Sequence, residues 1–140
     1  AKRELENVQF KAYQPRDSLW ASLTLPDVHL ISLSPSVEGM IMPSKYYGVA
    51  AAGRPSIFIG DPEGEIAEII RNADSGVTVP VGAGEVLASS LVDLARDHDR
   101  RRELGGNARR DFEARFNKPI PLAIWRDLLD RLSNDREPRR

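Results

Sequence analysis

The feature that most constrains the fold is an alternation between short β-rich apolar runs and segments with the periodicity of an α-helix. Strands are expected at residues 8–10, 29–33, 56–59 and 76–79. The second and third of these runs are almost continuously apolar, as in strands that are covered on both faces. Strands and helices that alternate in this way form βαβ units around a parallel sheet. The sequence therefore predicts an α/β fold, a Rossmann-like three-layer α/β/α arrangement with a mostly parallel sheet.

Helices are expected in the segments between and after these strands. One is predicted at residues 17–25, and another at residues 44–52, between a proline that suits a first turn (Pro43) and a glycine that suits the position after the last (Gly53). Apolar stripes at helical spacing predict two more, both facing the sheet. Their members are Ile66, Ile69, Ile70 and Ala73 in the first, and Leu87, Leu91, Leu94 and Ala95 in the second.

The last part of the chain is highly charged. Gly105-Gly106 is expected to break this segment into two pieces. Its basic and acidic residues are mixed at helical spacing, which is more typical of a solvated face than of a patch for nucleic acid or an anionic membrane. A final amphipathic helix with Trp125, Leu128, Leu129 and Leu132 could fold back over a neighbouring domain. We expect residues 1–132 to form one domain and residues 133–140 to be a disordered tail.

Composition excludes several classes of protein. The 140 residues suit one compact domain, and a net charge of −1 argues against a general nucleic-acid binder. Because the chain has no cysteine, it has neither disulfides nor thiolate ligands, and its two histidines lack a third partner at metal-ligand spacing. No apolar stretch approaches the roughly 20 residues that span a bilayer. The chain begins at Ala1 in a polar run, so we expect it to be a fragment.

Candidate ligand contacts lie in loops that follow the predicted strands, where open parallel sheets bind ligands. The loop of residues 34–43 leads to a helix N-terminus, whose free N–H groups attract phosphate oxygens. Ser44 and Lys45 could add a hydroxyl and a positive charge, and Glu38 could accept hydrogen bonds from sugar hydroxyls. Each residue also has a structural explanation, since Ser44 could cap the helix, Lys45 could be solvated and Glu38-Gly39 could form a turn.

Two further loops carry weaker signals. Residues 60–65 place carboxylates and glycines after a buried strand, with Gly64 permitting close approach of a ligand and Glu65 in a first helical turn. Glu65 is favourable there without any function. The segment Gly82-Ala83-Gly84 precedes a helix but lacks the full glycine pattern of a dinucleotide site.

An ordered series of motifs resembles the C-terminal half of the group 1 retaining glycosyltransferases, which have two Rossmann-like domains in the GT-B fold. The series covers the chain from Asn7 to Leu132. Its members are Asn7-Val8-Gln9-Phe10, Leu25-Pro26-Asp27-Val28, Pro35-Ser36-Val37-Glu38-Gly39-Met40-Ile41-Met42-Pro43, Ala51-Ala52-Gly53-Arg54-Pro55, Gly64-Glu65-Ile66-Ala67-Glu68-Ile69-Ile70, Asp74-Ser75-Gly76-Val77 and Arg102-Glu103-Leu104-Gly105, followed by Phe116. The block Pro43-Ser44-Lys45-Tyr46-Tyr47-Gly48 is most similar to a subgroup of amino-deoxysugar transferases of capsule or O-antigen synthesis.

The chain departs from the family pattern in two places. The family's paired glutamates lie eight residues apart, and if Glu38 is the first, the second falls on Tyr46 or, with another anchoring, Gly48. A ribose contact would then come from backbone, from Tyr46 or from elsewhere. The family's domain also opens with a further strand and helix, which carry an Arg and a Lys that hold the diphosphate. This chain is expected to lack that first β–α unit, as well as the N-terminal acceptor-binding domain.

The resemblance implies a transferase that moves a sugar from a nucleotide-diphosphate donor, UDP-linked in our interpretation, to a hydroxyl acceptor in polysaccharide or lipid-linked glycan synthesis. Glu38 and Lys45 would be its catalytic residues, and the donor would also contact Gly39, Ser44, Tyr46, Gly64 and Glu65. No metal, cofactor or nucleic-acid partner is implied, and the location would be cytoplasmic, with peripheral attachment of the parent enzyme to the inner membrane surface as an option. The fragment alone would be inactive.

Two alternatives belong to other functional classes. A non-catalytic α/β regulatory or interaction domain could use Asp61 at a strand end as a phosphoacceptor, although two further carboxylates would have to converge there, and Asp27 lies at the wrong end of its strand. The second alternative is that the chain is half of a nucleotide-sugar epimerase with the same two-domain architecture.

Overall fold

A three-stranded parallel sheet forms the centre of the computed structural model, which describes residues 5–134. The strands are β1 (His29–Ser32), β2 (Ser56–Gly60) and β3 (Gly76–Pro80), and they lie in the order β1-β2-β3. Ile31 pairs with Phe58, and Phe58 with Thr78, so the strands are in register across the sheet. Three of the four predicted strands and the Rossmann-like α/β/α class are confirmed.

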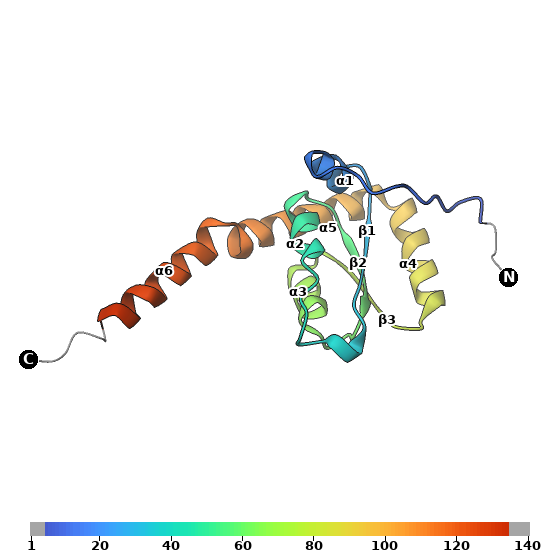
Figure 1. The fold of residues 1–140 in the computed structure, drawn as a ribbon. Helices are drawn as coiled ribbons and strands as arrows, with labels where there is room; N and C mark the ends of the chain where they lie inside the picture. Colours follow the sequence, from blue (N-terminus) through green and yellow to red (C-terminus); the bar gives the residue numbers. More distant parts are fainter. Residues whose placement is uncertain (1–4, 135–140) are drawn as a thin grey trace, which may run out of the picture.

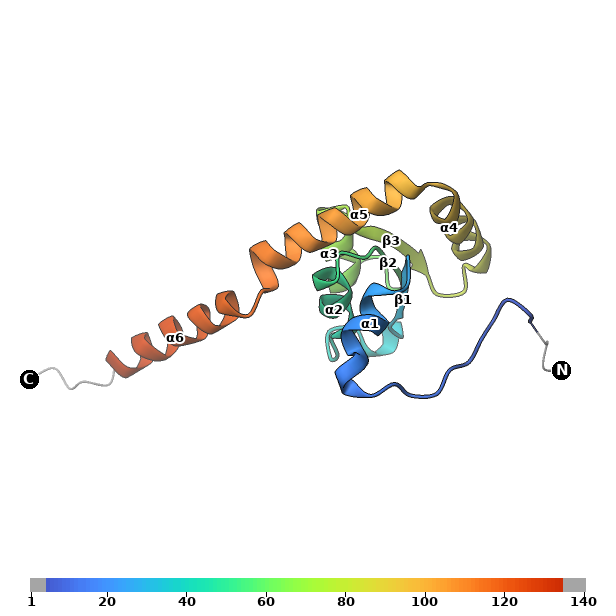
Figure 2. The ribbon, with the colours of Figure 1, turned by 90° about the horizontal axis from the view of Figure 1, so that it is seen from above.

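The helices form layers on both faces of the sheet (Figure 1). The crossovers from β1 to β2 and from β2 to β3 contain α2 (Lys45–Ala51) and α3 (Glu65–Ala73). Right-handed crossovers that advance in one direction place their helices on the same face. The chain then continues into α4 (Gly84–Arg96) on the opposite face, and α5 (His98–Asp111) runs across the sheet (Figure 2).

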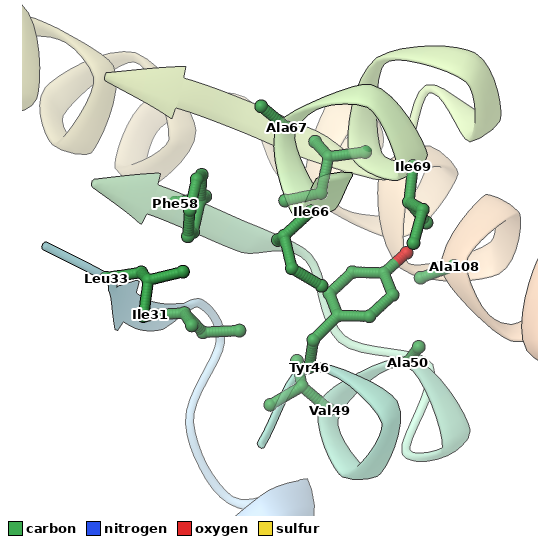
Figure 3. Packing of buried hydrophobic residues seen from close by; sticks show 11 residues of the cluster. Ile31, Leu33, Tyr46, Val49, Ala50, Phe58, Ile66, Ala67, Ile69 and Ala108 are labelled. Carbon is green, nitrogen blue, oxygen red and sulfur yellow. The ribbon is translucent and has the colours of Figure 1, made fainter. Parts of the chain in front are cut away.

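Two hydrophobic clusters fill the space between these layers. On the α2 and α3 side, Figure 3 shows how the side chains of β1 and β2 meet those of the two helices. This cluster comprises Ile31, Leu33, Tyr46, Val49, Ala50, Phe58, Ile66, Ala67, Ile69, Ile70 and Ala108. The cluster on the other side is smaller and comprises Ile57, Val79, Leu94 and Leu104. The predicted stripe of α3 is thus confirmed, whereas in α4 only Leu94 is buried and Leu91 is 40% exposed.

The prediction of a strand at residues 8–10 was wrong. This segment has no strand partner, and its Phe10 side chain is 97% exposed. Figure 2 shows the segment leading away from the sheet. A β-strand needs hydrogen bonds to a neighbouring strand, and a local run of β-favouring residues does not determine whether such a neighbour is present. The predicted helix at residues 17–25 is confirmed as a short 3₁₀ turn, η1 (Arg16–Ser18), followed by α1 (Leu19–Thr24).

The expected break at Gly105-Gly106 is also wrong, because α5 continues through both glycines. The reason is a close crossing with the C-terminal end of α2. A Cβ atom on Gly105 would lie 2.3 Å from the carbonyl oxygen of Gly53. Gly105 therefore allows two backbones to approach, and the helix tolerates the glycine for the sake of this packing.

The C-terminal helix extends away from the body of the domain (Figures 1 and 2). After a π-helical turn, η3 (Phe112–Phe116), the final helix α6 covers Pro119–Asn134, in agreement with the predicted amphipathic helix. Its apolar side chains are exposed, including Trp125 at 61%. Residues 133 and 134 are helical instead of part of a disordered tail, and the remainder of that predicted tail, residues 135–140, lies outside the described residues.

Candidate functional site at the carboxyl ends of the strands

The loop after β1 brings Glu38 to the carboxyl end of the sheet. The loop turns through η2 (Pro35–Val37), in which the hydroxyls of Ser34 and Ser36 lie 2.9 Å apart. Val37 packs against the larger core cluster, which anchors the turn. Glu38 follows directly and is half-buried.

The Glu38 carboxylate lies on the N-terminus of α3. Its Oε1 atom accepts a hydrogen bond of 3.0 Å from the backbone N–H of Glu65. A carboxylate is favourable here because the first N–H groups of a helix are unpaired and carry partial positive charge. The structure therefore joins three predicted site residues, Glu38, Gly64 and Glu65, across 27 positions of sequence.

Gly64 makes this contact possible. A Cβ atom at position 64 would lie 2.6 Å from Glu38 Cδ and 2.7 Å from its Oε1, closer than real Cβ contacts allow. Any other residue at this position would displace the carboxylate from the helix N-terminus. The sequence predicted a close approach at Gly64, but to a ligand, whereas the group that approaches it here is the Glu38 carboxylate.

The second carboxylate oxygen of Glu38 is chemically distinctive. Oε2 is buried, and no group among the described residues donates a hydrogen bond to it. A buried acceptor without a partner costs roughly 1–3 kcal/mol, more for a charged group. Glu38 thus has one oxygen fixed by a hydrogen bond and one buried oxygen with unused acceptor capacity.

Lys45 does not point toward Glu38. Its ammonium group donates to the backbone carbonyl of Leu30 at 2.9 Å, and the described residues contain no ion pair between Lys45 and Glu38. The backbone N–H groups of His29 and Leu33 donate hydrogen bonds on the β2 side of the strand. Because the backbone groups of successive residues point to opposite sides of a strand, the carbonyl of Leu30 faces the open edge of β1. The predicted convergence of Lys45 with Glu38 is absent because the lysine satisfies this edge carbonyl.

The remaining candidates of the first loop also differ from expectation. Tyr46 is a core residue, 1% exposed, whose hydroxyl lies 3.3 Å from Ser75 Oγ, so it is not available to a ligand in this structure. Burial raises its pKa. Ser44 is exposed and its hydroxyl makes no capping bond. Gly39 adopts φ +76° with open space around it, so its role is the left-handed turn.

The loops after β2 and β3 are tight turns. Asp61 accepts a hydrogen bond of 2.9 Å from the N–H of Glu63, so its side chain stabilises its own turn. Within residues 5–134, no group of three His, Asp or Glu side chains could hold a metal ion. Gly82 has φ +87° and helps to line a hollow of about 150 Å³ beside Ile59 and Leu87.

Sequence reasoning missed which backbone group Glu38 would contact. The only local signal was the pair Gly64-Glu65 at a helix start, and nothing in it specifies a partner far away in the sequence.

The part of the chain that the structure describes contains no helix both long and apolar enough to cross a membrane. Comparisons with protein-family models, curated proteins and solved structures find no match to this chain.

Proposed function

We propose that this chain is the donor-binding part of a glycosyltransferase, which moves a sugar from a nucleotide-diphosphate donor to a hydroxyl acceptor with retention of configuration. The observation that carries the proposal is the Glu38 carboxylate, held by α3 at the carboxyl ends of parallel strands with one buried oxygen free of protein donors. Ligands of open α/β sheets bind at this edge. The ordered motifs between Asn7 and Leu132 supply the reaction class.

Glu38 has the role of orienting the donor sugar. An ionised carboxylate offers only acceptors, so Oε2 accepts from a sugar hydroxyl while Oε1 stays on the N–H of Glu65. The bond to α3 fixes the carboxylate before the donor arrives, which lowers the entropic cost of binding. Gly64 keeps the carboxylate in this position, and Gly39 provides the turn that follows it.

Stabilisation of the departing diphosphate is assigned to residues outside this chain. Lys45 is bonded to Leu30 at the edge of β1, so it is a weak candidate for that role in this arrangement. The family pattern instead places an arginine and a lysine on a strand–helix unit that precedes the motifs found here. The isolated chain should therefore bind the donor weakly and transfer no sugar, and detectable transfer by it alone would contradict this division of labour.

The test is a titration of the ¹⁵N-labelled full chain with UDP-sugars, followed by NMR. We expect saturable shifts at the amides of Gly39, Gly64 and Glu65. Glu38→Gln keeps the shape of the side chain but removes its charge, and should raise Kd by about 10- to 100-fold, the loss expected for one charge-assisted hydrogen bond.

The matched control is Glu63→Gln in the neighbouring turn. The Glu63 side chain is 85% exposed and lies 4.0 Å from Arg71, so its neutralisation changes the overall charge equally without touching the Glu38 carboxylate. Kd should remain unchanged in this variant. Equal Kd values for Glu38→Gln and the unsubstituted chain, or shifts confined to other parts of the sheet, would refute the proposal.

A further inference from the structure

A separate pocket lies at the amino ends of the strands, opposite the Glu38 site. Its volume is about 260 Å³. Asp27 precedes β1, Arg54 precedes β2, and three residues from the N-terminal part of α5 complete the lining. The lining residues are Asp27, Gly53, Arg54, Pro55, His98, Arg101 and Arg102.

Arg101 is the most unusual of these residues, because its charged side chain belongs to a residue that is only 9% exposed. Its guanidinium donates to the carbonyl groups of Leu94 and Ala95 in the last turn of α4, the latter at 2.9 Å, and to His98 Nδ1. None of these three partners is a carboxylate, so they do not neutralise the guanidinium as an ion pair would. The C-terminal dipole of α4 offsets part of the charge, equivalent to roughly half a negative charge.

The other two arginines leave the pocket with an excess of positive charge. Arg54 donates to the carbonyl of Thr24, and neither Arg54 nor Arg101 has a carboxylate within ion-pairing distance among residues 5–134. Arg102 pairs with Asp99 at 3.1 Å, but both side chains are at least 80% exposed, so that pair is weak. Three guanidinium groups and one carboxylate, that of Asp27, give the lining a net charge of +2.

We propose that this pocket binds the phosphate group of a small, soluble phosphate monoester. Guanidinium groups present paired N–H donors at the spacing of phosphate oxygens. A phosphate monoester has a second pKa of about 6 and is therefore close to a dianion at neutral pH, which matches the charge of the lining. Asp27 can only accept, so it selects an ester that carries a hydroxyl group near the phosphate.

This site is independent of the proposed donor site. The parallel strands place Arg54 at the start of β2, whereas Gly64 follows its end. A ligand seated among the arginines would contact the loop before β2 and the first turn of α5, and would leave the Glu38–Glu65 contact unchanged.

The experiment is an NMR titration of the ¹⁵N-labelled full chain with inorganic phosphate and with glycerol 1-phosphate, at constant ionic strength. Both probes should cause saturable shifts at the amides of Arg54, His98 and Arg102, and the ester should bind more tightly. Asp27→Asn should reduce the difference between the two probes. If inorganic phosphate binds as tightly as the ester, the assignment to an ester is wrong.

Variants of Arg54, which is half-buried, and of Arg102, which is exposed, test the site without removing the buried Arg101. Arg101 joins α4 to α5, so its substitution would disturb folding as well as binding. Arg54→Gln and Arg102→Gln should each raise Kd for glycerol 1-phosphate by about tenfold or more. Arg126→Gln on α6 removes the same charge away from the pocket and should leave Kd unchanged.

Three further results would overturn the proposal. The first is a titration without saturation, and the second is a set of shifts centred on Gly39 and Glu65 at the other end of the sheet. The third is unchanged affinity in both Arg54→Gln and Arg102→Gln. Because the two sites perturb different amides, failure at the arginine pocket leaves the glycosyltransferase proposal standing, and the reverse also holds.

Discussion

The two faces of the sheet are covered to very different extents. On one face, α2 and α3 bury β1 and β2 beneath a continuous cluster. On the other, α4 packs over β2 and β3, while Leu30 of β1 is 45% exposed. A helix is about 10–12 Å wide and strands are about 4.8 Å apart, so one helix covers roughly two strands. Two crossover helices therefore cover most of a three-stranded face, whereas one helix cannot.

β1 is an edge strand, so it has an open edge as well as a face that is only partly covered. Its carbonyl at Leu30 is satisfied by Lys45, and the charged lysine discourages a second chain from pairing there. The exposed face and the open edge thus occur together on β1.

α5 contributes to both hydrophobic clusters, with Leu104 on one side of the sheet and Ala108 on the other.

The largest effect is expected at the centre of the well-covered face. Phe58 is fully buried, and its ring lies so close to Gly60 that a Cβ there would be 2.4 Å from Cζ. Phe58→Ala should lower the free energy of unfolding by about 3–5 kcal/mol, through lost burial and the cavity that remains. Urea denaturation measures this loss. A cost below 1 kcal/mol would show that this face is not closely packed in solution.

The crossing of α5 over the end of α2 gives the next largest effect. Gly105→Ala would place a Cβ 2.3 Å from Gly53 O, so backbone must move, and we expect a loss of about 1–3 kcal/mol. Gly106→Ala is the matched control, because its nearest contact is the flexible end of Arg110 at 3.4 Å. Alanine should stabilise the helix there by about 0.5–1 kcal/mol. Equal effects of the two substitutions in thermal denaturation would contradict the close crossing.

The fold was predictable where the determinants are local. The stripe of Ile66, Ile69 and Ile70 and the signals at Pro43 and Gly53 depend on neighbours a few positions away, and the structure confirms them. The predictions for residues 8–10 and for the Gly105-Gly106 pair were wrong because the conformation of these residues depends on partners far away in the sequence. A strand needs a neighbouring strand, and Gly105 lies inside a helix at the point where the backbone of Gly53 crosses it.

The candidate site was predictable only in its location. Strand order and direction place the loops at one end of the sheet, which is sufficient to expect Glu38 near Gly64 and Glu65. The direction of the Lys45 side chain depends on an unpaired carbonyl of an edge strand, and the burial of Tyr46 depends on how α2 rests on the sheet. Neither follows from spacing along the chain. The arginine pocket was missed because mixed charges indicated a solvated face.

A pH dependence is expected from His29 at the start of β1. Its ring is buried and bonded to the carbonyl of Leu23 at 2.9 Å. Burial lowers the pKa of His29 below 6.5, the hydrogen bond opposes this, and the charges of Lys45 and Arg54 add to the lowering. The unfolded chain therefore binds the proton more readily than the folded chain. Stability is fully present above pH 6.5 and falls as the pH decreases toward the folded pKa.

The measurement is the free energy of unfolding between pH 7.5 and 5.5. Each unit of difference between the folded and unfolded pKa corresponds to about 1.4 kcal/mol. His29→Gln keeps an N–H donor for Leu23 and should flatten the curve in this range. A slope of the same size in the His29→Gln variant would assign the effect to other groups.

The smallest effect is expected at the uncovered face, at Leu30. Leu30→Thr keeps a residue that favours strands and removes apolar atoms of a side chain that is already 45% exposed. The free energy of unfolding should therefore change by about 0.5 kcal/mol or less. The neighbouring substitution Ile31→Thr is the matched control, since Ile31 is 3% exposed on the opposite face and should cost at least about 2 kcal/mol. The pair compares the two faces within a single strand, with the backbone and the type of substitution held constant. If both variants lose the same stability in urea, the Leu30 face is covered in solution and the asymmetry between the faces is wrong.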